Sequence, residues 1–396
     1  MNGSEWFSLV FGTILGIVLT EVYEKIIVRF VRNKYRTVVL KNRFKLYNDD
    51  AIRDFIFRYY GNNFADLFDC EILGVTKRIL FLTNKTWSEL NIDIYESQDI
   101  LKLINSPSPQ YKVNNQMIKK RSFIGQRLFD DDALYLSRVT TDCKIESKKC
   151  RFYQKLTLID ALERETFSVA VRKFRKRTKL RDATLKTFQT AISTKNYPVS
   201  LGCHVVLIIN IDGKKYVALE TRSNQTFTYG GSIASVPVFG MVPIPQNQNS
   251  TIGDNLKENV LLYNILKEYS EELYNRDSLE KIANRTDPFW FYEDLSETHS
   301  LIQSLQEKKS HCRFLGYGFD AINGLSILAT MLYIEDDMLS KSIYKNCNAN
   351  WEIDNDSIMF YSINDHAILD YHNNSKFQNG TAFALALALK AISNYK

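Results

Sequence analysis

Proline and glycine are scarce in this sequence. The 396 residues include only 7 prolines and 16 glycines, which excludes a collagen-like chain and argues against long disordered segments of that composition. Aromatic residues are plentiful by contrast, with 24 Phe, 22 Tyr and 4 Trp, and side chains of this size need burial. Domains average roughly 150 residues, so we expect two or three structural units.

Cysteine and histidine patterns typical of metal sites are absent. None of the six cysteines forms a CxxC pair, and Cys143 and Cys150 are spaced too widely for a zinc knuckle. The five histidines contain no HxxxH pair, so a zincin site is not expected. We therefore expect free thiols in a reducing compartment. The net charge of +6 permits an anionic partner without identifying one.

Long apolar runs are also rare, and the mean hydropathy of −0.25 excludes a protein with many membrane spans. The clearest run covers residues 6–20, fifteen residues without a charge. A signal peptide is disfavoured because Glu5 precedes the run and no A-x-A site follows it. A buried soluble helix is disfavoured because it is rarely apolar on all sides. We therefore predict a transmembrane helix with a basic juxtamembrane segment over residues 1–36.

Two features of this N-terminal segment favour a membrane helix. Gly12 and Gly16 form a GxxxG motif, which lets two helices pack closely in lipid. Eight cations lie between Lys25 and Lys45, against only two glutamates close to them. Because basic residues stay on the cytoplasmic side, we predict a single pass with the C-terminal body in the cytoplasm and membrane lipids as partners.

Residues 37–195 read as an α/β middle region. Apolar spacing predicts helices over 48–61 and 153–174, and strands over 72–87 and 133–145. The second helix runs into a basic run, residues 172–181, with seven cations in ten residues. This run is either a solvated helix face or a phosphate-contacting surface, and both interpretations stay open.

Residues 196–396 have a regular α/β pattern. Asp212-Gly213 and Asn323-Gly324 are hairpin signals between β-rich runs. Helices are predicted over 256–275 and 380–392, and a further strand over 351–363. Residues 236–244 lead through a polar loop into the first of these helices. The pattern predicts a C-terminal α/β/α sandwich.

The helix at 256–275 carries clustered carboxylates. Glu268 lies three and four positions before Glu271 and Glu272, so at least Glu268 and Glu272 share a face. Clustered carboxylates repel one another unless a cation lies between them, and oxygen ligands suit Mg²⁺ or Mn²⁺. The same cluster also fits an ordinary solvated helix face.

The sequence around this helix resembles the Nudix box, G-x5-E-x7-R-E-U-x-E-E-x-G-U. The positions that match are Gly253 for the first glycine, Glu268, Tyr269 for the hydrophobic position, and Glu271 and Glu272 for the final acidic pair. In the Nudix family this acidic pair holds divalent metals. The resemblance therefore implies Mg²⁺ as a cofactor, held by Glu268, Glu271 and Glu272, and a Nudix-like C-terminal sandwich.

The box also departs from the family pattern. Asn259 stands at the first acidic position, Lys267 replaces the arginine and Tyr274 replaces the late glycine. Gly240 is an alternative turn glycine, with a longer loop before the helix. Because three positions break the box, we assign no catalytic residue and expect hydrolysis to be weak or absent.

The whole layout resembles the SMODS-associated NUDIX proteins, which are encoded beside cyclic oligonucleotide synthases (CD-NTases) in bacterial CBASS anti-phage systems. The resemblance implies an effector of the bacterial inner membrane. Its body would sense a cyclic oligonucleotide made by the cognate CD-NTase, its chains would form a homo-oligomer on activation, and its helix would then disrupt the membrane. No DNA partner is expected. The alternatives are a membrane-tethered Mg²⁺-dependent Nudix hydrolase of nucleoside diphosphate derivatives and a non-catalytic scaffold.

The ligand site is expected near Gly240 and the carboxylate-bearing helix. A cyclic oligonucleotide carries one negative charge per phosphate, so carboxylates alone would repel it. Cations must therefore contribute, either as Mg²⁺ or as side chains. The candidates for binding the nucleotide are Arg222, on the strand before Gly240, and Arg172 and Arg175 in the basic run.

Overall fold

The structure is a computed structural model of the full chain. The structure describes all residues except 1–2, 24–27, 29, 32–33, 35–37, 39–46, 48, 62–65, 106–110, 172–176, 195–196, 246–253, 277–278, 280–286, 375 and 394–396. For residues 3–11, 254–255 and 354–357 it describes the backbone alone.

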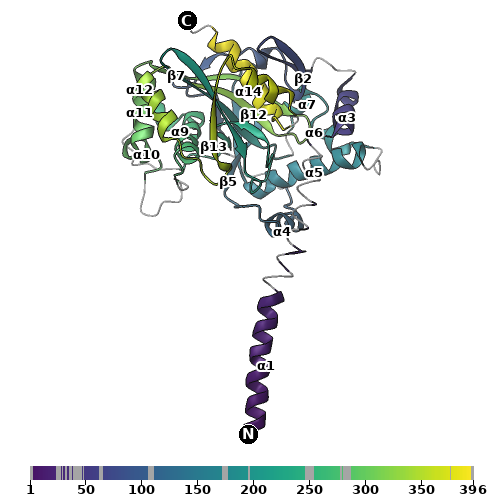
Figure 1. Cartoon of the computed structure of the whole chain (residues 1–396). Helices are drawn as coiled ribbons and strands as arrows, with labels where there is room; N and C mark the ends of the chain where they lie inside the picture. Colours follow the sequence, from purple (N-terminus) through teal and green to yellow (C-terminus); the bar gives the residue numbers. More distant parts are fainter. Residues whose placement is uncertain are drawn as a thin grey trace.

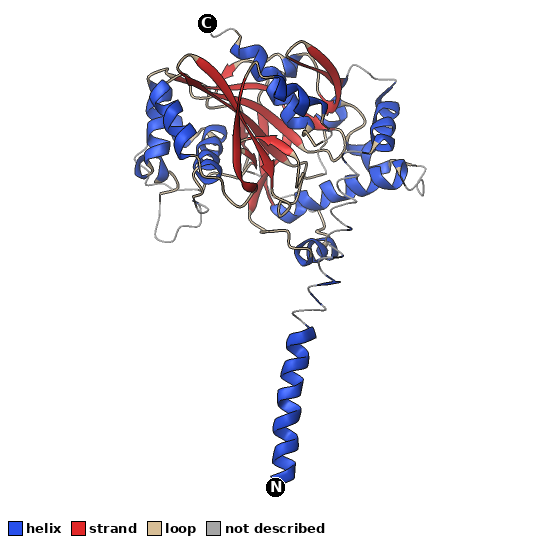
Figure 2. Ribbon diagram, in the orientation of Figure 1, coloured by secondary structure: helices blue, strands red, loops and turns tan. Residues whose placement is uncertain are grey.

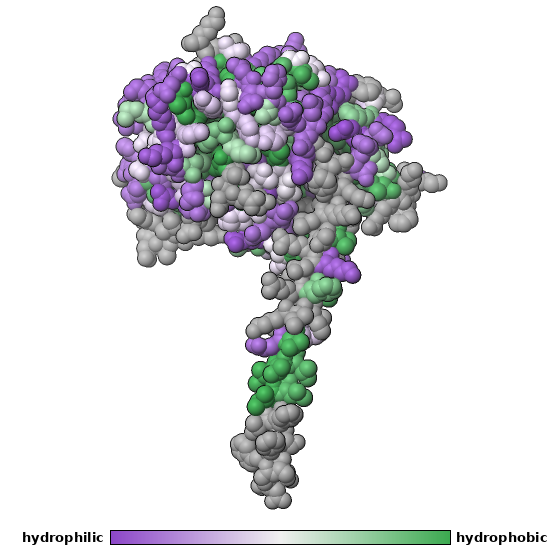
Figure 3. Space-filling model, viewed as in Figure 1, coloured by the Kyte–Doolittle hydropathy of each residue, from purple (hydrophilic) through white to green (hydrophobic). Residues whose placement is uncertain are grey.

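The N-terminal segment forms a long helix, α1 (Gly3–Val22), which stands apart from the folded body (Figure 1). Its described apolar side chains are exposed, as in Ile17 with 59% of its surface accessible, and Figure 3 shows them as a hydrophobic section. None of the helices in the described part of the chain is both long and apolar enough to cross a membrane.

This finding corrects the predicted transmembrane helix. An α-helix rises 1.5 Å per residue, so the fifteen-residue uncharged run covers about 22 Å of a hydrocarbon core of about 30 Å. Glu21 lies in the last turn of the same helix. The fold class is therefore α/β without an established membrane span.

A ten-stranded curled sheet forms the centre of the body (Figure 2). Its main path runs β1-β2-β11-β12-β7-β8-β13, with β3, β9 and β10 paired to β11, β8 and β7. The strands are β1 (Leu67–Ile72), β2 (Val75–Leu82), β3 (Ile92–Asp93), β7 (Leu201–Ile211), β8 (Lys214–Arg222), β9 (Ile233–Ser235), β10 (Val238–Gly240), β11 (Ser310–Asp320), β12 (Ser326–Ile334) and β13 (Ile353–Ser362).

Turn residues explain where the strands reverse. Asp212 and Gly213 have φ of 49° and 77°, the left-handed conformation that a tight hairpin between β7 and β8 requires. Gly324 has φ of 74° in the turn from β11 to β12. Both hairpins predicted from the sequence are therefore confirmed, whereas the central pair, β7 and β12, is parallel.

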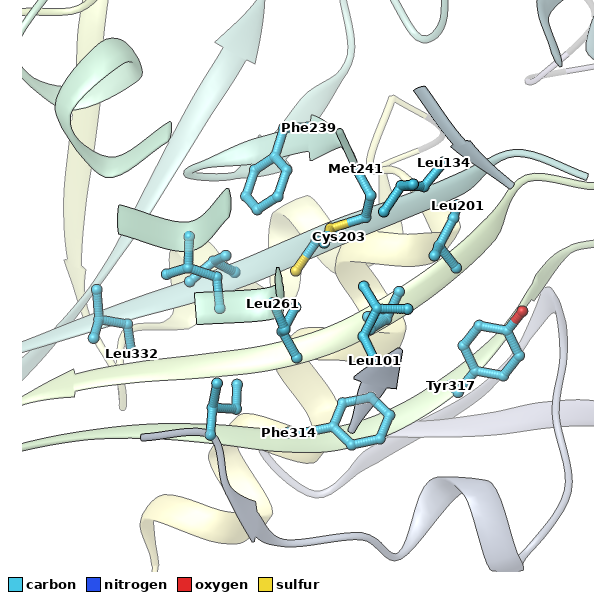
Figure 4. Packing of buried hydrophobic residues seen from close by; sticks show 14 of the residues in the cluster. Leu101, Leu134, Leu201, Cys203, Phe239, Met241, Leu261, Phe314, Tyr317 and Leu332 are labelled. Carbon is cyan, nitrogen blue, oxygen red and sulfur yellow. The ribbon is translucent and has the colours of Figure 1, made fainter. Parts of the chain in front are cut away.

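Helices cover both faces of the sheet. Side chains alternate along β7, so that Val205 and Leu207 join the core on one face while Val206 and Ile208 join the core on the other. The first core includes α9 (Val260–Leu273), and Figure 4 shows Leu261 packed near Cys203 and Phe239. The second core is covered by α14 (Asn379–Ile392). The predicted α/β layering is confirmed.

The middle part of the chain contributes to the same sheet. Leu82 of β2 pairs with Phe319 of β11, so strands from the segments predicted as separate regions lie in one sheet. A second, three-stranded sheet contains β4 (Leu101–Leu103), β5 (Asp132–Val139) and β6 (Ile145–Arg151). The long helix α5 (Phe152–Ala170) follows β6 directly.

The remaining elements are short. They are α3 (Asp50–Tyr60), η3 (Thr86–Ser88), α4 (Asn115–Phe123), α6 (Lys179–Thr184), α7 (Phe188–Ile192), α8 (Asp254–Lys257), α10 (Phe291–Asp294), α11 (Ser296–Gln306), α12 (Asp337–Asn346) and α13 (His366–Asn373). Asp49 caps α3 by accepting a hydrogen bond from the Ala51 amide at 2.9 Å, which confirms the start predicted for that helix.

The end of the basic run belongs to the core. The side chain of Arg181 is fully buried and donates hydrogen bonds to the carbonyls of Ala321 and Ile322, the latter at 2.7 Å, and to Thr166. Arg181 therefore holds the turn after β11 against α5 and does not face a ligand. Residues 172–176 of the run lie outside the described residues.

Candidate functional site

A large cleft opens where α5 approaches β10 and α9. Its volume is about 460 Å³, within the range of small-molecule sites. The middle part of the chain supplies one wall and the large sheet the other. Residues that line it include Lys155, Leu156 and Ile159 of α5, Gly202 and His204 of β7, Gly240 of β10, Lys267, Glu268 and Glu271 of α9, and the segment Asn350–Glu352.

Lys155 is the most unusual group in this cleft. Only 2% of its surface is exposed, and burial lowers the pKa of its ammonium from 10.5 to about 8. The Nζ atom lies 4.8 Å from the centre of the Phe152 ring. Within the described residues Lys155 has neither an ion pair nor a side-chain hydrogen bond. The cleft therefore contains a buried cation without a counter-charge.

Gly240 provides the space for this ammonium group. A Cβ atom at position 240 would lie 2.8 Å from Lys155 Nζ, too close for an unchanged side chain. Gly240 pairs with Gly202 at the end of β10, which brings the bare backbone of the strand beneath α5. The predicted site residue Gly240 therefore lies in the cleft, beside a cation that the sequence reasoning missed.

The α9 carboxylates are placed by a helix cap. Asn259, the residue at the first acidic position of the box, accepts a hydrogen bond from the Leu262 amide at 3.0 Å and donates one to the Ile94 carbonyl at 2.6 Å. Position 259 therefore starts the helix and does not hold a metal. Two turns later, Glu268 and Glu271 line the cleft.

The Lys267 ammonium lies between these two carboxylates. Its Nζ is 2.8 Å from Glu268 Oε1 and 3.4 Å from Glu271 Oε2. Burial raises the pKa of Glu268 to about 8, and the neighbouring Lys267 opposes this rise. The position where carboxylates of this helix would hold a divalent cation is thus taken by a protein cation.

Glu272 is directed to a different environment. It is fully buried and accepts a hydrogen bond from the Val238 amide at 3.0 Å. Burial holds its pKa well above the usual value. The described residues contain no group of three or more His, Cys, Asp or Glu arranged to hold a metal ion. The Lys267 ammonium between Glu268 and Glu271 argues against Mg²⁺ at this helix, and Mg²⁺ stays a prediction.

Arg222 lines the cleft but already has partners. Its guanidinium donates to the Val238 carbonyl at 2.8 Å and to Glu352 at 2.6 Å, and it lies 3.2 Å from Glu220. Burial raises the pKa of Glu220 to about 8. Arg222 therefore neutralises buried carboxylates beneath the cleft, where it had been predicted to bind a nucleotide.

Aromatic side chains complete the rim. The guanidinium of Arg127 stacks 4.7 Å above the Trp351 ring, and no ion pair of Arg127 is seen in the part of the chain that the structure describes. Phe129 lines the cleft with 55% of its surface exposed, and Phe227, whose ring the Arg121 guanidinium covers at 5.1 Å, also lines it. These flat apolar faces beside unpaired cations suit a ligand that combines phosphates with planar rings.

The structure thus gathers only part of the predicted site. Gly240, Arg222, Glu268 and Glu271 line one cleft, whereas Arg172 and Arg175 lie outside the described residues, as does Gly253. Gly12 and Gly16 lie on α1, and a Cβ atom added to either would meet nothing within 4 Å.

The sequence reasoning missed Lys155, Arg127 and Trp351. A signal existed for Lys155, because it precedes Leu158 and Ile159 by three and four positions and so falls on the apolar face of its helix. In comparisons with known proteins, the chain matches no family model and none of the curated proteins. The chemistry of the cleft therefore has to be argued from its own geometry.

Proposed function

We propose that this chain is a non-hydrolytic nucleotide sensor whose cleft binds a cyclic oligonucleotide, in a bacterial antiviral defence system of the CBASS type. The observation that carries the proposal is the buried, unpaired ammonium of Lys155 in a cleft of about 460 Å³. The defence context comes from the sequence resemblance to the SMODS-associated NUDIX proteins.

The placement of the charges in the cleft supports an anionic ligand, although the described lining has five cations and five carboxylates overall. Arg222 is bonded to Glu352, Lys267 to Glu268 and Arg276 to Glu297, while Lys155 and Arg127 have no ion pair within the described residues. A phosphate beside Lys155 would supply the missing counter-charge at a site already removed from water, where charge-assisted hydrogen bonds are strongest.

The aromatic rim supports a ligand with bases. Stacking on an aromatic side chain is worth about 1–3 kcal/mol per base, whatever the base. Trp351 and Phe129 lie at the rim, while Lys155 lies deeper against Gly240. A compact ring of alternating phosphates and sugars, with bases projecting from it, therefore matches the arrangement of cations and flat surfaces. In this account the bound form is the one that self-associates, because a ligand shifts the population toward the state it prefers.

Hydrolysis of a nucleoside diphosphate derivative is the second candidate, because Glu268 and Glu271 line the same cleft. The position of Lys267 between them and the burial of Glu272 argue against metal-dependent turnover. An assay for nucleoside monophosphate released from nucleoside diphosphate derivatives in the presence of Mg²⁺ separates the two functions. Turnover that is lost in Glu268→Gln and Glu271→Gln would favour the hydrolase.

A binding screen tests the sensor proposal. The full chain is titrated with a panel of cyclic di- and trinucleotides in a calorimeter, with linear dinucleotides as the control. The proposal predicts that at least one cyclic member binds and is recovered intact afterwards. Release of a linear product, or equal binding of linear and cyclic forms, would contradict it.

A further inference from the structure

A second, smaller cavity lies between the β1–β2 hairpin, the segment Tyr229–Ser232 and the start of α14. Its volume is about 80 Å³, which is room for several water molecules but well below that of typical sites for whole small-molecule ligands. It is separate from the cleft described above, although Thr226, Tyr229 and Gln378 line both.

The lining of this cavity carries charge of one sign. Arg53 of α3, Lys77 and Arg78 of β2, and Lys376 all line it, and none of the described lining residues is Asp or Glu. Arg78 is paired with Asp69 at 2.6 Å. Lys77 donates to the His372 carbonyl at 3.1 Å, and burial together with Arg53 lowers its pKa. Arg53 and Lys77 are therefore close enough to repel each other.

His372 adds an unpartnered polar group to the same cavity. Only 2% of its surface is exposed, and neither ring nitrogen has a hydrogen-bond partner within the described residues. A neutral imidazole carries one N–H donor and one acceptor, and leaving a buried polar group unpaired costs about 1–3 kcal/mol. An oxygen atom in the cavity would accept the imidazole hydrogen bond that no protein group takes.

The backbone around the cavity also suits an anion. The helix α14 begins at Asn379, a lining residue, and its fourteen residues place the positive end of the helix dipole at the cavity. On the opposite side, Gly230 and Gly231 form a close turn in which Gly231 has φ of 77°. A Cβ atom at position 230 would lie 3.1 Å from Asn224 Cα, so the turn leaves little room for a side chain.

We infer that this cavity binds a single small oxyanion group of the phosphate class, distinct from the nucleotide cleft. The cavity is too small for a nucleotide. Four cationic side chains, one imidazole without a described hydrogen-bond partner and a helix N-terminus line it. The anion would neutralise Lys77 and Arg53 and accept a hydrogen bond from His372. This inference stands independently of the proposed function.

Inorganic phosphate is the probe for this site. The full chain, labelled at its histidines, is titrated with phosphate while the His372 imidazole is followed by NMR and its pKa is measured. Burial and then the neighbouring Lys77 lower the His372 pKa, which keeps the imidazole neutral in the free protein. Arg53, Arg78 and Lys376 also line the cavity. A bound anion favours protonation, so phosphate should raise the His372 pKa and raise Tm.

Variants locate the effect. Lys77→Gln should weaken phosphate binding at least tenfold. If this variant folds poorly, Lys376→Gln offers a second test at an exposed side chain. Lys102→Gln, an exposed lysine of β4, is the matched control and should change nothing. A saturable shift of His372 that Lys77→Gln and Lys376→Gln weaken but Lys102→Gln does not would support the inference. An unchanged His372 signal in millimolar phosphate, or equal affinity in all variants, would overturn it.

Discussion

Lys155 of α5 and Gly240 of β10 meet in the cleft at a distance that only glycine permits. A Cβ atom at position 240 would lie 2.8 Å from the Lys155 ammonium nitrogen. The contact joins a helix from the middle part of the chain to a strand of the large sheet, and it places a buried cation at the point where the two walls meet. The predictions below follow from this arrangement.

The Gly240→Ala variant should bind the anionic ligand more weakly while its fold stays intact. The new methyl group must displace the Lys155 ammonium, which is the flexible end of a long side chain, so the free energy of unfolding should change little. Loss of one charge-assisted contact corresponds to roughly tenfold or more in affinity. Calorimetry and thermal melting measure both quantities. Gly12→Ala, at an open position on α1, is the control, and equal binding by the two variants would refute the contact.

Burial of Lys155 should make folding stability depend on pH. The pKa of the Lys155 ammonium is about 8 in the folded chain, whereas its ordinary value is 10.5. The unfolded chain therefore binds this proton more tightly, so stability falls as pH is lowered from about 10.5 to 8 and the loss is complete below that range. Each pKa unit corresponds to about 1.36 kcal/mol, so the effect is up to roughly 3 kcal/mol.

Chemical denaturation of wild type and Lys155→Met across this pH range measures the effect. The variant should gain stability relative to wild type at pH 7, and the electrostatic part of that gain should shrink toward pH 10.5. A stability difference that does not change with pH would show that the Lys155 ammonium is solvated.

Removal of Arg222 should destabilise the fold through the carboxylates that it neutralises. Arg222→Leu removes the cation shared by Glu220, Glu272 and Glu352, and breaking a buried ion pair costs about 3–5 kcal/mol where the remaining carboxylate stays charged. Burial raises the pKa of Glu220 to about 8 and holds that of Glu272 well above its usual value, so the loss approaches this range only at alkaline pH. The loss should be smaller at acidic pH, where both carboxyls are protonated.

Equilibrium unfolding at pH 5 and pH 8 tests this assignment. Adding Glu272→Gln to Arg222→Leu should recover part of the lost stability. If the Arg222→Leu variant folds as stably as wild type at pH 8, Arg222 is free for the ligand and its predicted role in binding is restored.

We expect the Lys267 ammonium to prevent divalent metal ions from binding between Glu268 and Glu271. In Lys267→Met, Glu268 and Glu271 lose the ammonium between them and would repel one another unless a cation replaces it. We expect Mn²⁺ to bind the variant more tightly than wild type, which electron paramagnetic resonance of free Mn²⁺ measures. Lys341→Met, at an exposed ion pair with Asp337, is the control. Tight Mn²⁺ binding by wild type would contradict this reading.

Local signals in the sequence predicted much of the fold. The Asp212-Gly213 and Asn323-Gly324 turns fixed two hairpins, because the residues that tolerate positive φ are few and recognisable. Pairing between distant strands has no such signal, so the contact of Leu82 with Phe319 was not predicted. The apolar run at 6–20 was misread because its composition suits a membrane while its length does not.

The candidate site was predicted in part for a similar reason. Gly240 and Glu268 were found from local spacing, and both line the cleft. Lys155 was missed because its importance comes from burial against a strand more than eighty residues away, which helical periodicity only hints at. Asn259 departs from the box at its first acidic position, and the structure gives the reason, because this residue caps α9.

The most direct test of the account is the affinity of the full chain for the cyclic oligonucleotide proposed as its ligand, measured as a function of pH in wild type and in Lys155→Met. The account predicts that wild-type affinity falls as pH rises through about 8, as Lys155 loses its proton, and that Lys155→Met binds at least roughly tenfold more weakly at pH 7 without this pH dependence. Lys119→Met, at an exposed lysine of α4, should behave as wild type. Binding in Lys155→Met that matches wild type at every pH would contradict the account.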